Sequence, residues 1–184
     1  RRRLIVTDSV FSMAGDVAPL AELCDLAEAH DAMLLIDEAH ATGVFGEQGR
    51  GLAERDGVED RMHFRVGTLS KAVGACGGFV SGPQPLIEWL WNRARPQIFS
   101  TALPPPVCAA ACAAVEIIQS EPWRRTDLLQ RAKQFRAAVV AAGFKTIPAA
   151  VAPIVPILLD DPKSAVRTAA ALEEQGFLVG AIRP

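Results

Sequence analysis

The stretch MLLIDEAH, Met33 to His40, decides the fold class. It is a continuous apolar run that ends abruptly in charged and polar side chains, a pattern typical of a buried parallel strand with polar groups at its carboxyl end. Upstream, LIVTD (4–8) predicts a short strand. After Pro19, a residue favoured at helix starts, LAELCDLAEAHDA (20–32) has the apolar spacing of a helix. Strand, helix and strand therefore follow in order.

The alternation continues downstream with two more predicted strands and a helix. These are HFRVGT (63–68), GGFVSG (77–82) and PQPLIEWLWNRAR (83–95). We therefore predict an α/β fold, a mostly parallel sheet with helices on its faces. In such sheets ligands bind outside the carboxyl ends of the strands, which is where Asp37, His40 and Thr68 fall.

The second half of the chain reads as mainly helical. After the three prolines of STALPPP, helices are predicted over 107–120 and from Pro122 to the glycine at 143. The arginines of WRRTDLLQRAKQFR (123–136) predict a solvated helix face. The tail predicts a strand over 152–161, a helix over 164–176 and a strand over 177–184, a pattern that suggests a smaller second domain.

Composition excludes several classes of protein. A net charge of −2 and a pI near 5.9 argue against binding to nucleic acid or to an anionic membrane. No apolar run reaches the roughly 18 residues of a membrane span, and the N-terminus lacks the apolar stretch of a signal peptide. The four cysteines form no CxxC pair, so we predict reduced core residues and no metal site. We expect a cytoplasmic protein.

The DEAH block admits two interpretations. In a DEAH-type helicase the two acidic residues hold magnesium beside ATP, but that function needs a GxxxxGK[ST] phosphate loop, which the sequence lacks. In the second interpretation Asp37 and His40 share one crevice with Lys71, which follows the next strand. A lysine that forms an imine with an aldehyde cofactor needs a tight, uncrowded turn, and small residues such as Gly67 and Gly74 surround Lys71.

Five blocks, in order, resemble the α-oxoamine synthases, fold type I pyridoxal phosphate (PLP) enzymes that join an amino acid to an acyl thioester with loss of carbon dioxide. They are VFSMAGD (10–16), DEAHATGVFGEQGRG (37–51), GTLSKAVGACGG (67–78), FSTALPP (99–105) and GAIRP (180–184). The resemblance implies that residues 1–105 are part of the large PLP-binding domain, 106–142 are connecting helices, and 143–184 are an incomplete small C-terminal α/β domain.

The resemblance also assigns catalytic roles. Lys71 is similar to the Schiff-base lysine that also moves protons at the α-carbon of the amino acid. Asp37 resembles the partner of the pyridinium nitrogen, which lets the ring accept electrons from a carbanion. His40 resembles the residue that hydrogen-bonds the cofactor's 3-hydroxyl oxygen.

Further cofactor and substrate contacts follow from the same resemblance. Ser12 resembles a second hydroxyl on the cofactor's phenolic oxygen, and Thr68 the phosphate-binding threonine. Thr101, next to Ser100, resembles a hydroxyl brought to the phosphate from a neighbouring subunit, which implies a homodimer with shared active sites. Arg183 resembles the arginine that holds the substrate carboxylate.

Within the family, DEAHATG and AIRP lean toward the members that condense L-alanine with a pimeloyl thioester, carried by coenzyme A or an acyl carrier, into the biotin precursor 8-amino-7-oxononanoate. The alternatives are a relative that uses glycine or serine, or an inactive fragment that acts only as an interaction module. Asp8 stands where the family has glutamate, and Ala14 where it has an acidic residue.

The largest departure from the family is length. Its members begin before VTDSVFSM and continue beyond AIRP, so the chain resembles a fragment. The segments without a counterpart include a glycine-containing phosphate loop, the aromatic residue that stacks on the cofactor, and the acyl-binding tail. We therefore expect the 184 residues alone to be inactive.

Overall fold

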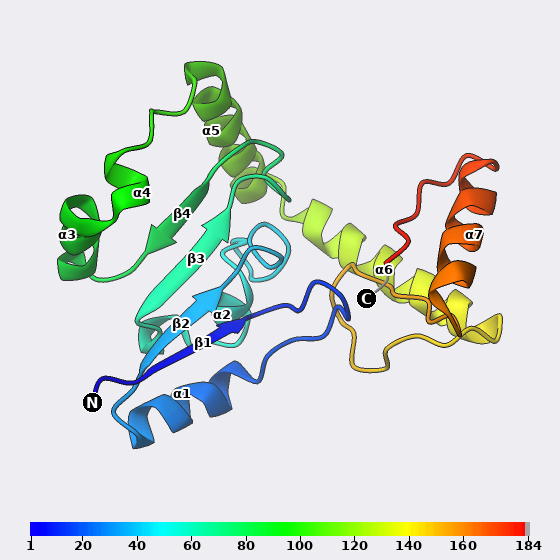
Figure 1. Cartoon of the computed structure of the whole chain (residues 1–184), viewed down its shortest axis with the longest axis horizontal. Helices are drawn as coiled ribbons and strands as arrows, with labels where there is room; N and C mark the ends of the chain where they lie inside the picture. The colour runs from blue at the N-terminus through cyan, green and yellow to red at the C-terminus, as the bar shows by residue number, and fades with distance from the viewer. Residues whose placement is uncertain (183–184) are drawn as a thin grey trace.

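The computed structural model describes residues 1–182 and contains a four-stranded sheet (Figure 1). Its strands are β1 (Leu4–Asp8), β2 (Met33–Asp37), β3 (Phe64–Thr68) and β4 (Gly78–Ser81), in that spatial order. The first three are parallel and β4 is antiparallel to β3. The predicted α/β fold with a mostly parallel sheet is confirmed.

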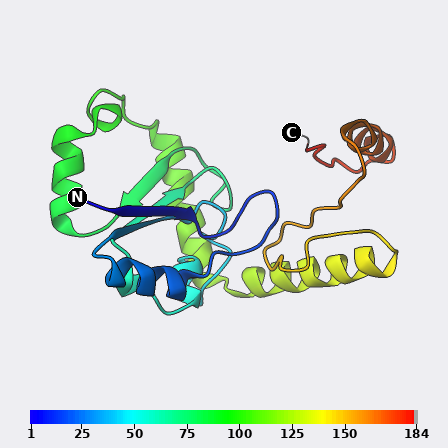
Figure 2. The ribbon, with the colours of Figure 1, turned by 60° about the horizontal axis from the view of Figure 1, so that its bottom comes forward.

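The connections between the parallel strands cover one face of the sheet. Helix α1 (Leu20–Ala29) joins β1 to β2, and the short α2 (Leu52–Arg55) and the 3₁₀ turn η1 (Glu59–Arg61) lie between β2 and β3. Figure 2 shows α1 beneath the sheet. Its buried Leu20, Cys24 and Ala27 follow the i, i+4, i+7 spacing of one helix face. They pack in one core with Leu34 and Ile36 of β2, neither of which is exposed.

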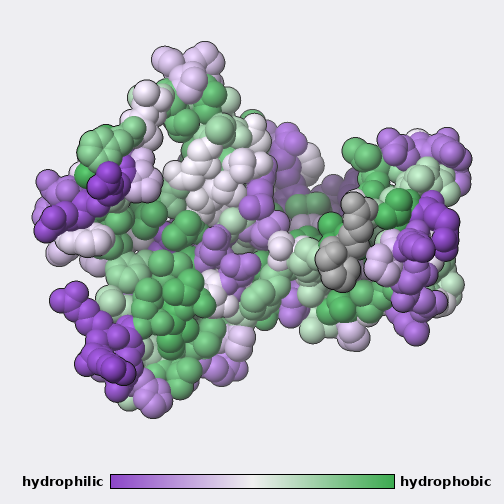
Figure 3. Space-filling model, viewed as in Figure 1, coloured by the Kyte–Doolittle hydropathy of each residue, from purple (hydrophilic) through white to green (hydrophobic). Residues whose placement is uncertain are grey.

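The opposite face of the sheet is open. Leu4 and Val6 of β1 are 50% and 61% exposed, and Val80 of β4 is 43% exposed. Because the side-chain period of a strand is two, these residues share a face on which Met33 and Leu35 are half-buried. Figure 3 shows the resulting hydrophobic patch over β1 and β2.

Each of the remaining helices has a proline at or next to its first residue, where the missing N–H would be unpaired in any case. They are α3 (Gln84–Arg93), α4 (Arg95–Ile98), α5 (Pro105–Ser120), α6 (Trp123–Ala141) and α7 (Pro162–Glu173). Helix α7 has a side-chain cap, since Asp161 accepts hydrogen bonds from the N–H groups of Lys163 (2.8 Å) and Ser164 (3.0 Å). Figures 1 and 2 show α6 running away from the sheet, with α7 beyond it.

The two strands predicted in the tail are wrong for the residues that the structure describes. Over 152–161 the only strand-like pairing is an isolated bridge between Lys145 and Leu158, and 177–182 is irregular. Pro153 and Pro156 have no N–H to donate to a ladder, which interrupts the first segment. The last two residues of the second predicted strand, 183–184, lie outside the described range.

Two further predictions need correction. Of the four free cysteines only Cys24 is buried; Cys76, Cys108 and Cys112 are exposed. The predicted solvated face of 123–136 is also interrupted. Arg125 is 6% exposed and donates hydrogen bonds to the carbonyl oxygens of Ile118 and Glu47, so it ties α6 to the loop before α2.

Candidate active site

The carboxyl ends of β1, β2 and β3 meet at one edge of the sheet. Asp8 and Asp37 are partners in the parallel register, and Thr68 is the last residue of β3. The loops that follow these strands carry Ser12, His40 and Lys71. The structure therefore gathers most of the predicted site residues at the edge where α/β folds bind ligands.

The Asp37 carboxylate is fixed by the turn that follows it. Its Oδ1 accepts a hydrogen bond from the N–H of Ala39 at 2.8 Å. The carbonyl oxygen of Asp37 accepts another hydrogen bond, from the N–H of Ser9 at 2.8 Å. These contacts join the ends of β1 and β2 and hold the carboxylate at the edge.

His40 lies in the same turn and is half-buried. Burial, and then the positive charge of Lys71, lower the pKa of His40, while Asp8 and Asp37 act in the opposite direction. His40 is thus close enough to all three charged groups to respond to them. A lowered pKa favours the neutral imidazole near pH 7, a form that both donates and accepts hydrogen bonds.

Lys71 lies in a compact turn between β3 and β4. The turn is closed by hydrogen bonds from the N–H of Leu69 to Gly77 O (2.9 Å) and from the N–H of Ala75 to Leu69 O (2.7 Å). Gly74 and Gly77 have φ of +67° and +112°, a region that side chains other than glycine rarely adopt. The Lys71 side chain is exposed, as an amine that must reach a ligand requires.

The hydroxyls of Thr68 and Ser70 form a pair 2.7 Å apart at the start of this turn. Thr68 Oγ1 also accepts from the N–H of Ser70 (3.2 Å) and donates to Gly77 O (3.1 Å). Two hydroxyls beside the lysine suit an anionic group. Sequence reasoning singled out Thr68 and missed Ser70, although TLSK places both within four residues.

A hollow of about 210 Å³ adjoins this edge and is lined by residues from distant parts of the chain. They include His40, Lys71, Ala72, Leu128, Pro153 and Ile154. No sequence motif marks the last three of these residues.

The segment carrying Pro153 and Ile154 is held from two sides. The N–H groups of Val151 and Ala152 both donate to Gly15 O at 3.0 Å. Arg136 of α6 donates to Ala152 O at 2.7 Å. A Cβ at Gly15 would lie 2.7 Å from Ile154 O, so the close approach of the two segments requires glycine there.

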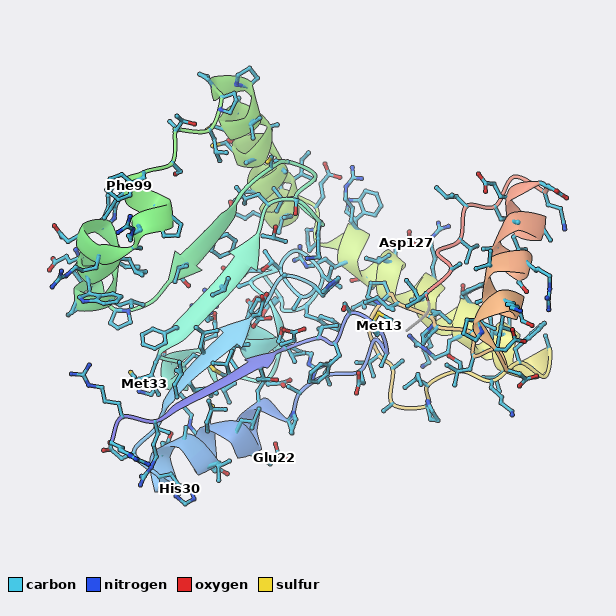
Figure 4. All side chains as sticks on the ribbon, in the orientation of Figure 1. Met13, Glu22, His30, Met33, Phe99 and Asp127 are labelled. Carbon is cyan, nitrogen blue, oxygen red and sulfur yellow. The ribbon has the colours of Figure 1, made fainter. Side chains whose placement is uncertain are left out.

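Ser12 lies on the loop after β1, whose tip carries Met13 (Figure 4). This loop is closed by a hydrogen bond from Gly15 N–H to Phe11 O at 2.8 Å. Ser12 lines a separate hollow of about 370 Å³ together with Asp8 and Asp16. The structure thus places Ser12 beside Asp8, in a hollow separate from the one that His40 and Lys71 line.

The two remaining predicted residues are Thr101 and Arg183. Thr101 is exposed in the segment between α4 and α5. The neighbouring Leu103 approaches the lysine turn, since its Cδ1 is 3.0 Å from the place of a Cβ at Gly77. Arg183 lies outside the described residues. Within 1–182 no cluster of side chains suits a metal ion, and no helix is long and apolar enough to cross a membrane.

A family model and a curated relative both match this chain over its whole length. The family model described as aminotransferase class I and II covers residues 1–184. An 8-amino-7-oxononanoate synthase of Anaeromyxobacter dehalogenans is 53% identical over 184 residues, which are 100% of this chain and 46% of the relative.

Two solved structures are similar to this chain over nearly all of its length. A serine palmitoyltransferase of S. paucimobilis with bound PLP–myriocin is 37% identical with a TM-score of 0.93, covering 97% of this chain and 47% of that one. An 8-amino-7-oxononanoate synthase of Francisella tularensis is 28% identical with a TM-score of 0.87, covering 97% and 53%. The chain spans about half the length of the curated relatives it matches.

Proposed function

Because the chain belongs to the aminotransferase class I and II family, we propose that it is the lysine-bearing part of a PLP-dependent 8-amino-7-oxononanoate synthase. The enzyme would condense L-alanine with a pimeloyl thioester, with decarboxylation. One observation carries the proposal: Lys71, His40 and Asp37 meet at the carboxyl edge of the sheet in a chain 53% identical to such an enzyme.

Two predictions from the sequence are confirmed by these relatives. The likeness to α-oxoamine synthases, with fold type I, agrees with the relatives named above, and PLP as the cofactor agrees with the PLP-bound relative. The residues of this chain fit that cofactor. The edge offers an exposed amine, a carboxylate fixed by Ala39, a neutral imidazole and a pair of hydroxyls.

Each of these groups would meet a different part of the cofactor. Asp37 would hold a proton on the pyridine nitrogen, and His40, with Ser12 from the neighbouring loop, would bind the phenolic oxygen. Thr68, assisted by Ser70, would bind the phosphate. Thr101 of a second subunit would reach the same phosphate in a homodimer, and Arg183 would bind the carboxylate of the amino acid.

Lys71 would have two tasks. Its amine would bind the cofactor's aldehyde carbon until the amino acid replaces it, and would then take and return the proton at the α-carbon as general base and acid. PLP supplies the electron-accepting ring that makes loss of that proton feasible. The apolar wall of Leu128, Pro153 and Ile154 would limit water beside the amine.

The layout of the chain supports the domain division proposed from the sequence. Residues 1–105 would belong to the large domain, 106–142 would connect, and 143–184 would form part of a small domain, in keeping with the position of α7 beyond α6 (Figure 1). We also propose a cytoplasmic location.

The amino acid and acyl chain used are the finer part of the proposal. The similarity to a serine palmitoyltransferase favours a second candidate, a relative that takes serine or glycine. Full-length enzyme assayed with alanine, serine and glycine against pimeloyl and palmitoyl thioesters separates the two. Turnover with alanine and pimeloyl thioester supports the first candidate, and turnover only with serine or glycine refutes it.

A direct test of the site needs no substrate. PLP added to the protein should give a visible absorbance band that borohydride treatment fixes as a covalent adduct on Lys71, identified by peptide mass spectrometry. Lys71→Ala should abolish both. Adduct formation on another lysine, or an equal band in the variant, would refute the assignment of Lys71.

A further inference from the structure

Glu38 stands between Asp37 and His40, and nothing in the proposed chemistry uses it. Its side chain is 2% exposed, and both of its carboxylate oxygens accept hydrogen bonds from the protein. Oε2 accepts from the hydroxyl of Ser9 at 2.7 Å and from the N–H of Leu52 at 3.0 Å, and Oε1 accepts from the N–H of Ala53 at 2.9 Å. All three partners are donors, which suits a carboxylate. The group therefore ties the loop after β1 to the start of α2.

Gly51 makes this contact feasible. A Cβ at this position would lie 2.7 Å from Glu38 Cδ, and the backbone φ is +124°. Any other residue would therefore collide with the carboxylate and be strained as well. Close approach of α2 to Glu38 is thus built into the sequence GRGLA (49–53).

The backbone of Glu38 organises the turn that carries His40. Its N–H donates to Val66 O of β3 at 2.7 Å. Its carbonyl oxygen accepts from the N–H groups of Ala41 (2.9 Å) and Thr42 (2.8 Å). Ser9, whose hydroxyl donates to the Glu38 side chain, also donates its N–H to Asp37 O. One buried residue thus connects three strand ends with α2.

We propose that Glu38 is a positioning residue that fixes Asp37, His40 and the loop bearing Ser12 relative to one another. Its buried carboxylate is bound by three donors of the protein and would act through them. The inference rests on the proposed function for its catalytic consequence. The geometric part, that Glu38 sets the surroundings of His40, stands on the hydrogen bonds alone.

Glu38→Gln is a sharp test because it preserves shape. A glutamine has one acceptor oxygen and one NH₂, so whichever way it turns, the NH₂ faces the N–H of Leu52 or Ala53, neither of which can become an acceptor. Ser9→Ala is the milder variant. It removes the hydroxyl that links Glu38 to the end of β1. The hydrogen bonds from the N–H groups of Leu52 and Ala53 and the charge of Glu38 stay in place.

Glu54→Gln is the matched control. Glu54 also binds two backbone N–H groups of the loop before α2, those of Gln48 (3.0 Å) and Arg50 (2.8 Å). Among the hydrogen bonds of residues 1–182, however, none joins its side chain to β1 or β2. The control removes a negative charge from the same region without touching the strand ends.

The first readout is the NMR titration of His40, which needs no cofactor and reports on Lys71, Asp8 and Asp37 around it. We expect Glu38→Gln and Ser9→Ala to shift its midpoint and Glu54→Gln to leave it unchanged. A shift in Ser9→Ala cannot come from lost charge. In the PLP-loaded full-length enzyme, Glu38→Gln should lower kcat about ten- to a hundredfold with little change in KM.

The outcomes separate the two levels of inference. If Glu38→Gln and Ser9→Ala lower only the free energy of unfolding, with the His40 midpoint and kcat at wild-type values, Glu38 is structural and the proposal is wrong. If the wild-type protein binds no PLP, the proposed function fails, but the His40 titration still decides the positioning role.

Discussion

Asp8 and Asp37 lie opposite each other at the last register position of β1 and β2, so their side chains leave the same face of the sheet at its carboxyl edge. Both raise the pKa of His40, against the larger lowering by burial and by Lys71. The candidate site is therefore an imidazole between two carboxylates and one ammonium group, whose charges can be removed singly.

The first prediction concerns these charges. Lys71→Met removes the positive charge and should raise the pKa of His40, whereas Asp8→Asn should lower it. The pKa is measured from the Hε1 resonance in the cofactor-free protein, assigned with His40→Gln. Equal titrations in wild type and both variants would show that these groups do not surround His40.

The second prediction follows from the lowered pKa of His40. In the unfolded chain His40 has its ordinary pKa of about 6.5, whereas in the folded chain its pKa is lower. Between these two pKa values the unfolded chain binds a proton that the folded chain does not. The free energy of unfolding therefore falls as the pH drops from 6.5 toward the folded-state pKa. His40→Gln should remove this component. Denaturant titrations from pH 7.5 to 5 should show a shallower decline for the variant, and parallel curves would contradict the prediction.

Much of this edge was predictable from the sequence, because continuous apolar runs ending in polar residues mark parallel strands. MLLIDEAH and HFRVGT predict both β2 and β3 and the positions of Asp37 and Thr68 at their ends. The roles of all the site residues stay predictions. They are Asp37, His40, Lys71, Thr68, Ser12, Thr101 and Arg183.

What escaped prediction depends on long-range contacts. Pro153 and Ile154 reach the His40 hollow only because Gly15 and Arg136 hold their segment, and no local pattern encodes that contact. Helical spacing alone predicts Arg125 in solvent, because it does not reveal which turn of α6 faces a neighbouring loop. The prediction of two strands in the tail is wrong for a similar reason, because a strand forms only where another strand lies beside it.

The third prediction concerns the strand that leads to Lys71. A Cβ at Gly67 would lie 2.3 Å from Cζ of Phe79, its partner on β4. Gly67→Ala should therefore lower the free energy of unfolding by about 1–3 kcal/mol, the usual cost of overpacking. Urea denaturation measures it. Adding Phe79→Leu should recover part of the loss, because the two substitutions meet in space, whereas strictly additive losses would argue against the contact.

The fourth prediction separates the cysteines. Cys24 packs in the core between α1 and the sheet, where a reagent cannot reach its thiol. Burial also raises the pKa of this thiol, so less of it is present as the reactive thiolate. Cys76, Cys108 and Cys112 are exposed. A chromogenic disulfide reagent should therefore react with three thiols in the native monomer and with a fourth only on unfolding. Cys24→Ala should remove the reaction of the fourth thiol. Protection of Cys108 and Cys112 that rises with protein concentration would show that α5 becomes covered in an oligomer, whereas rapid labelling of Cys24 at low concentration would contradict the packing of α1.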